Sequence, residues 1–428
     1  MHLVELYSLV PFVAILLTIA VLPIFAHHWW ENNKNKLIIA VALSIPVIIY
    51  LIVKGLTLEL SHTLVFDYIP FIILIGSLYT ITGGIYLTGD IQAKPIVNSG
   101  FLATGAILAS IMGTTGAAML LIRALIYTNK ERKFKVHTIL FFIAVVANCG
   151  GLLTPLGDPP LFVMYLRGVS FFWFFTFFKE WLTVNSLLII IYFFVDMYYY
   201  KKEPKEDIAA DIKNIRKLKI KGKINFIWLI GVVLAVAFIN ENTIAFLKDN
   251  PYLKLIREAI ILMFAIFSVL MTPKLIRVSN NFTWEPIKEV AYLFFGIFIT
   301  MIPCLIYLNY NAKVLGVETA QEFYYYAGLL SSFLDNTPTA VAFHSLAMGL
   351  NISSGNLVGG IPEHLMEALC TGAVLFGSMT YIGNGPNFMV KAVAEENNIK
   401  MPHFFGYMIR FSLIVLLPVF ILVQLLFI

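Results

Sequence analysis

The sequence predicts an all-α polytopic membrane protein made of two inverted repeats, with a re-entrant hairpin and a broken helix in each. Of its 428 residues, 59% are apolar and 13% are charged, whereas about 25% of the residues of a soluble domain are charged. Apolar runs as long as a spanning helix follow one another along the chain. Two segments of the first half also recur, in order, in the second half. A soluble enzyme on one or two anchor helices is therefore excluded.

Ten apolar runs are predicted as spanning helices, because each is close to the roughly 20 residues that cross a hydrocarbon core. They cover residues 8–27, 37–54, 68–87, 137–154, 181–199, 224–247, 258–272, 289–308, 364–382 and 411–428. Two longer runs, residues 97–127 and 320–348, have a polar interruption in the middle. We predict that each of these forms a hairpin of two helices that enters and leaves the membrane on the same side.

The basic residues are distributed unequally between the loops. With the N-terminus outside, 21 Lys and Arg residues fall on the cytoplasmic side and 6 on the other side, as the positive-inside rule requires. The central loop, residues 201–223, has nine basic and four acidic residues, an excess equal to the net charge of +5. We therefore predict a cytoplasmic central loop, both termini outside and an inner or plasma membrane location. No nucleic-acid partner is indicated.

Two internal matches indicate a duplication. GLLTPLGDPPLFV (151–163) aligns without a gap with GSMTYIGNGPNFM (377–389), and SIMGTTGAA (110–118) aligns with SFLDNTPTA (332–340). Each half has five spanning helices, an odd number, so the second copy is inverted, as in many secondary transporters. The predicted units are residues 1–199 (hairpin 97–127, broken helix 137–168), the linker 200–223, and residues 224–428 (hairpin 320–348, broken helix 364–396).

Both matched segments include Gly/Pro-rich stretches, residues 155–160 and 383–386, that break a helix in mid-membrane. Non-helical backbone is tolerated there only where protein or a water-filled cavity covers it. The breaks leave backbone carbonyls free and add four side chains with oxygen atoms, Thr154, Asp158, Thr380 and Asn384. Oxygen ligands suit hard cations. We predict Na⁺ sites at Asp158 and at Asn384, and no other cofactor.

Ionisable residues inside the bilayer are costly and therefore functional candidates. For Asp158 we favour cation or proton binding over helix capping. Asp335 precedes Asn-Thr-Pro, a good helix start, so it is a candidate cap as well as a candidate ligand. Arg123 either extends to the cytoplasmic surface or pairs with a carboxylate or an anionic substrate. His344 is either a satisfied core residue or a proton carrier.

The two hairpin tips and two breaks together resemble, over essentially the whole chain, the ion-transporter superfamily of NhaD-type sodium/proton antiporters, citrate and dicarboxylate carriers and arsenite permeases. This similarity implies a homodimer in which a transport domain slides against a scaffold. It also implies that each tip faces the break of its own half, with two cation sites around a substrate cavity. The matching residues are Thr114, Thr115, Thr154, Gly157, Asp158, Asp335, Asn336, Thr337, Thr380, Gly383 and Asn384. Unlike the dicarboxylate carriers, which have Ser-Asn-Thr at both tips, this chain has Gly-Thr-Thr and Asp-Asn-Thr.

The predicted function is secondary active transport, and no enzyme activity is expected because no nucleophile–base or HExxH-type motif is found. Two buried carboxylates without an obvious organic-anion clamp favour Na⁺/H⁺ antiport, in which both cations compete for one aspartate. The alternative is a Na⁺- or H⁺-coupled carrier of citrate or another carboxylate. In that case, Thr and Asn residues of the tips, together with Arg123, would contact the anion. Small ions or a carboxylate, and membrane lipid, are the expected partners.

Overall fold

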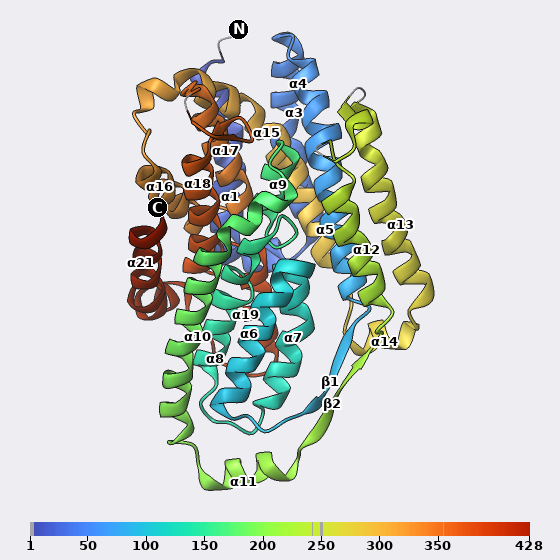
Figure 1. The fold of residues 1–428 in the computed structure, drawn as a ribbon, viewed down its shortest axis with the longest axis vertical. Coiled ribbons are helices and arrows are strands. Elements are labelled where there is room, and N and C mark those ends of the chain that lie inside the picture. Colours follow the sequence, from blue (N-terminus) through green and yellow to red (C-terminus); the bar gives the residue numbers. More distant parts are fainter. Residues whose placement is uncertain (1–3, 242, 249–250, 354) are drawn as a thin grey trace.

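The structure, a computed structural model, describes residues 4–241, 243–248, 251–353 and 355–428. It is almost entirely helical (Figure 1). The elements of residues 4–200 are η1 (Leu6–Leu9), α1 (Val10–Phe25), α2 (His27–Trp30), α3 (Asn33–Val53), α4 (Thr57–His62), the π-helical η2 (Thr63–Tyr68), α5 (Ile69–Thr82), β1 (Tyr86–Asp90), α6 (Pro95–Met112), α7 (Thr114–Thr128), α8 (Val136–Val145), η3 (Cys149–Leu153), α9 (Pro159–Leu166), η4 (Phe171–Phe177) and α10 (Phe178–Tyr200).

The rest of the described chain begins with the linker region, residues 200–223. Its elements are α11 (Lys205–Lys213), β2 (Arg216–Lys221), α12 (Asn225–Phe238), η5 (Ala245–Lys248), η6 (Pro251–Lys254), α13 (Leu255–Met271), α14 (Lys274–Ser279), α15 (Glu285–Leu315), α16 (Ala320–Phe333), α17 (Asn336–Gly349), β3 (Leu357–Val358), β4 (Ile361–Pro362), α18 (Glu363–Phe376), η7 (Gly377–Met379), α19 (Gly385–Glu396), α20 (Phe404–Tyr407), the π-helical η8 (Met408–Leu416) and α21 (Leu417–Phe427).

Eight helical stretches among the described residues are long and apolar enough to cross a membrane, which makes this a multi-pass membrane protein. Seven of them coincide with predicted spanning runs, and the eighth is α6, which we predicted as a hairpin arm. The other three predicted runs form α12, α13 and α18, with 14, 17 and 14 residues. The prediction for residues 224–247 was too long, because the backbone leaves the helical region at Ile239.

The two interrupted runs form helix–turn–helix pairs. α6 packs against α7, and α16 packs against α17. The first turn is made by Gly113, whose φ of 81° is readily available only to glycine. The second turn is followed by Asp335, whose side chain accepts a hydrogen bond from the Thr337 amide at 3.0 Å and so caps α17. The predicted helix start at Asp335 is confirmed, whereas the side of the membrane on which each pair opens stays a prediction.

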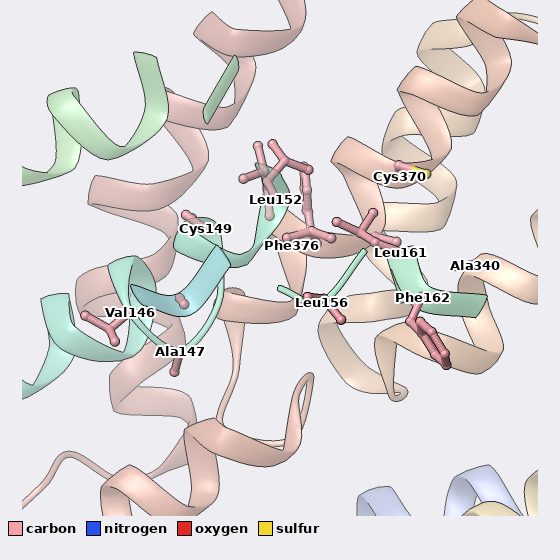
Figure 2. Close-up of a cluster of buried hydrophobic side chains, with 14 of the residues drawn as sticks. Val146, Ala147, Cys149, Leu152, Leu156, Leu161, Phe162, Ala340, Cys370 and Phe376 are labelled. Carbon is pink, nitrogen blue, oxygen red and sulfur yellow. The ribbon is translucent and has the colours of Figure 1, made fainter. Parts of the chain in front are cut away.

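Both predicted breaks are present, one between α8 and α9 and the other between α18 and α19. In each break, two glycines allow two segments of the backbone to pass close to each other. A Cβ added at Gly157 would lie 2.0 Å from the carbonyl oxygen of Gly151, and one at Gly383 would lie 2.6 Å from that of Gly377. Figure 2 shows the apolar side chains that surround the first break, contributed by both halves: Val146, Ala147, Cys149, Leu152, Leu156, Leu161, Ala340, Cys370 and Phe376. Polar groups within this apolar interior must therefore satisfy one another.

The linker region is more ordered than a solvated loop. Strand β2 pairs antiparallel with β1 (Figure 1), so the connection from α5 to α6 lies beside the connection from α11 to α12. Neither these strands nor α11 were predicted. At the same end of the molecule, Asp196 of α10 is buried and accepts from both Arg132 and His137 at 2.7 Å. These contacts fasten the end of α10 to the start of α8.

Surface labelling tests the predicted orientation. Single cysteines replacing Lys94, Lys133 and Lys205, which are all exposed, are expected to react with an impermeant thiol reagent only after cells are permeabilised. A cysteine appended after Ile428 is expected to react in intact cells. The native cysteines are buried and give a low background. Labelling of the Lys94 and Lys133 positions from opposite sides would contradict the re-entrant hairpin, and equal labelling at Lys205 and the C-terminus would contradict the inverted repeat.

Candidate functional site

Asp158 is the centre of the polar residues that the breaks and tips bring together. It is 1% exposed and accepts three side-chain hydrogen bonds. The donors are Thr114 Oγ1 at 3.0 Å, Asn336 Nδ2 at 2.5 Å and Asn384 Nδ2 at 3.1 Å. Asp158 occupies the N-cap position of α9, but its side chain makes no capping bond. Its carboxylate therefore joins both hairpin tips and both breaks instead of finishing a helix.

This arrangement differs from the two separate sites that the family resemblance implies. Thr114 does reach Asp158 from the tip of the same half. Asn336, however, belongs to the second tip and also bonds to Asp158, and Asn384 of the second break donates to the same carboxylate. In this structure Thr114, Asn336 and Asn384, which come from both halves, are grouped around the one carboxylate of Asp158.

Thr154 and Thr380 hold each break against its own hairpin. Thr154 Oγ1 donates to the carbonyl of Ser110, and Thr380 Oγ1 donates to that of Ser332. Each hydroxyl also accepts from the backbone amide two residues later, at 3.2 Å in both halves. The two threonines and their serine partners occupy equivalent positions of the internal repeat. Their hydroxyls thus position the breaks, and they do not contact Asp158.

The two break glycines also connect the breaks to their surroundings. The carbonyl oxygen of Gly157 accepts from the Thr114 amide at 2.8 Å, which fastens the first tip to the first break. The amide of Gly383 donates to Thr380 Oγ1 at 3.1 Å. Both predicted glycines therefore act through their backbone, as the absence of a Cβ allows.

A small, open cavity of about 40 Å³ adjoins Asp158 between α5, the first tip and the first break. This volume has room for about three water molecules or a small ion. Asp158 is the only charged residue among those that line it, which are Leu74, Ile75, Leu78, Tyr79, Met112, Gly113, Thr114, Thr115, Gly116, Pro155, Leu156, Gly157, Asp158, Pro159 and Phe162. The predicted residue Thr115 thus faces the cavity, whereas Asp335 and Thr337 serve the start of α17.

Arg123 and His344 lie outside this cluster. Arg123 donates a hydrogen bond to the backbone carbonyl of Asn280 at 3.3 Å. Its described partner is thus a backbone oxygen and not a carboxylate. The His344 ring lies between the Arg167 guanidinium, at 3.2 Å, and the carbonyl of Gly359, at 2.8 Å. Both ring nitrogens of His344 have partners, which agrees with the satisfied core histidine among the two alternatives.

Two buried amides at the site were not predicted. Asn148 and Asn387 are both 0% exposed, and Asn148 Nδ2 donates to Asn387 Oδ1 at 2.6 Å. Asn384 in turn donates to Asn148 Oδ1 at 3.1 Å. Internal symmetry does not reveal them, because the equivalent residues of the other half are Val374 and Leu161. An amide inside an otherwise apolar segment is the feature that would have singled out both positions.

Comparison with known proteins gives one family. No curated protein matches the chain. A family model described as "Putative citrate transport" matches residues 1–428, which is the whole chain. This match agrees with the superfamily resemblance of the tips and breaks and with the multi-pass helical fold. The chain therefore belongs to this citrate-transport family.

Proposed function

We propose that the protein is a secondary active carrier that moves citrate or a similar small carboxylate with Na⁺, and that Na⁺ binds at Asp158. The observation that supports this function is the single buried carboxylate at which both tips and both breaks meet. A negative charge in such a place is costly unless it has a partner. A cation that neutralises it is therefore a natural ligand, and the adjoining cavity of about 40 Å³ can admit such an ion.

The donors around Asp158 give a physical route from cation binding to movement. Thr114, Asn336 and Asn384 point hydrogens at the carboxylate, whereas Na⁺ requires oxygen atoms. The Thr114 hydroxyl can rotate, and each amide can present its oxygen only by turning over. Cation binding thus rearranges contacts between the two halves. A ligand that interacts differently with two arrangements shifts the equilibrium between them.

A second candidate is the Na⁺/H⁺ antiport that the sequence predicts, and the residues that line the cavity favour it. The described residues that line it include one carboxylate and no Lys, Arg or His. An organic anion would find no fixed positive charge there, whereas Na⁺ and H⁺ would compete for Asp158. This reading requires no second substrate in the cavity.

Proteoliposomes distinguish the two functions. The purified protein is reconstituted into vesicles that contain a pH-sensitive dye. An inward Na⁺ gradient is expected to drive uptake of radiolabelled citrate, and the uptake rates with Na⁺, Li⁺ and K⁺ are compared. Prompt proton movement on addition of Na⁺ alone, without citrate uptake, would replace the carrier function by Na⁺/H⁺ antiport.

A homodimer in the inner or plasma membrane remains part of the prediction.

A further inference from the structure

The buried asparagines next to Asp158 form a chain of side-chain hydrogen bonds. Backbone carbonyls fix which end of each amide group, the nitrogen or the oxygen, faces the next residue. Asn387 is the anchor of this chain, because its Nδ2 donates to the carbonyls of Gly377 at 2.8 Å and Thr380 at 2.9 Å. A carbonyl only accepts, and the amide nitrogen has two hydrogens. Both hydrogens of Asn387 are therefore used, and its oxygen must face the other way and accept.

Asn148 continues the chain with the same direction. Its Nδ2 donates to the carbonyl of Ile143 at 2.8 Å and to Asn387 Oδ1 at 2.6 Å. Both of its hydrogens are again used, so its oxygen is turned towards Asn384. Reversing the Asn148 amide would bring its oxygen against two other oxygen atoms within a fully buried site.

The Asn384 amide is oriented in the same way, and it contacts the carboxylate of Asp158. Its Nδ2 lies within hydrogen-bonding distance of three acceptors, Asn148 Oδ1 at 3.1 Å, the carbonyl of Ala147 at 3.2 Å and Asp158 Oδ1 at 3.1 Å, which share its two hydrogens. The amide nitrogen of Asn384 therefore faces Asp158, and its oxygen is kept away. This orientation follows from which partners can only accept, so it does not depend on an arbitrary choice between the amide oxygen and nitrogen.

We propose that Asn148 and Asn387 are positioning residues that hold the Asn384 amide nitrogen on Asp158 and thereby weaken cation binding. This inference rests on the proposed function, in which Asp158 binds the coupling Na⁺. The locked amide supplies a hydrogen where a cation needs an oxygen, so each binding event must displace it. A carrier benefits from a site that is not too tight, because the cation must also leave.

The internal repeat supplies the substitutions. Val374 and Leu161 occupy the positions equivalent to Asn148 and Asn387, so the fold already accepts these apolar residues in the other half. In Asn148→Val, the amide nitrogen of Asn384 loses one of its three acceptors and keeps the Ala147 carbonyl and Asp158. In Asn387→Leu, the Asn148 amide loses its anchor but keeps the carbonyl of Ile143.

Citrate uptake by proteoliposomes at fixed pH and varied Na⁺ tests the inference. We expect Asn148→Val to lower the half-saturating Na⁺ concentration by about three- to tenfold, the effect of about one hydrogen bond. The maximal rate is expected to stay within about twofold of the unmodified protein. Asn387→Leu is expected to act in the same direction and less strongly. The double variant should match Asn148→Val alone, because residues of one chain of hydrogen bonds are not additive.

Asn185→Leu is the matched control. Asn185 is also a buried amide, 3% exposed, and it donates to the carbonyls of Cys149 at 3.3 Å and Trp181 at 2.8 Å without contacting the asparagine chain. Its half-saturating Na⁺ concentration should equal that of the unmodified protein. Unchanged or raised values in Asn148→Val, or additive effects in the double variant, would overturn the positioning role. Uptake by the unmodified protein that does not respond to Na⁺ would overturn the proposed function and, with it, this inference.

Discussion

Asp158→Asn is expected to abolish Na⁺-driven transport while the protein still inserts and folds. The substitution keeps the size of the side chain and one acceptor oxygen but removes the charge. Its new amide group would also point hydrogens at a donor, either Asn336 Nδ2 or Asn384 Nδ2. A buried donor without an acceptor costs about 1–3 kcal/mol, which a membrane protein of this size can sustain. Citrate uptake and Na⁺-dependent proton movement in proteoliposomes measure the effect, and size-exclusion chromatography confirms folding.

Asp335→Asn is the matched control for this substitution. Asp335 is the aspartate of the second tip, and its carboxylate caps α17 through the Thr337 amide without a hydrogen bond to Asp158. Asparagine caps a helix about as well as aspartate, so transport should remain close to normal. Near-normal transport in Asp158→Asn together with loss in Asp335→Asn would move the cation site to the second tip.

Gly157→Ala is expected to destabilise the protein more than any other single methyl addition at the first break. The added Cβ would lie 2.0 Å from the carbonyl oxygen of Gly151, and backbone atoms cannot move aside as a flexible side chain can. Overpacking of a core typically costs about 1–3 kcal/mol and sometimes more. We expect poor yield of folded protein, or a melting temperature lowered by several degrees, measured by fluorescence-detected size-exclusion chromatography after heating.

Two other glycines calibrate this effect. Gly383→Ala, at the equivalent position of the second break, places the Cβ 2.6 Å from the carbonyl oxygen of Gly377 and should be less harmful. Gly385→Ala has no atom within 4 Å of the new Cβ and should melt like the unmodified protein. Equal melting temperatures for all three variants would show that there is more space around Gly157 and Gly383 than these distances indicate.

The helical architecture could be predicted largely from the sequence because it depends on local chemistry. Apolar runs mark the helices, since backbone polar groups in a bilayer must be satisfied within a helix. Gly113 and Asp335 mark the two turns because one tolerates a positive φ and the other caps a helix. The Gly/Pro stretches mark the breaks for the same local reasons. The exception is the chain between α12 and α13, where the predicted run continued past the end of the helix.

The short strands show where local chemistry is insufficient. β2 has the strand-like alternation Lys217-Leu218-Lys219-Ile220-Lys221, but nothing in it names its partner, and the pair forms because residues 86–90 meet residues 216–221. Likewise, Asp196 is buried because Arg132, in the loop before α8, and His137, in α8, reach its carboxylate. Pairings between segments far apart in the chain leave little trace in either segment alone.

The sequence by itself determined that Asp158 lies at a break between two helices and that carboxylate, hydroxyl and amide groups occur at the breaks and tips. Only the tertiary structure decided that one carboxylate serves both halves, through Asn336 and Asn384, which are 178 and 226 residues away. It also decided the orientation of the buried amides, since the carbonyl of Ile143 in α8 orients Asn148 and that of Gly377 at the second break orients Asn387. The physical reason is that buried polar groups must find partners wherever the fold places them. How the two halves pack against each other cannot be predicted from the sequence of either half alone.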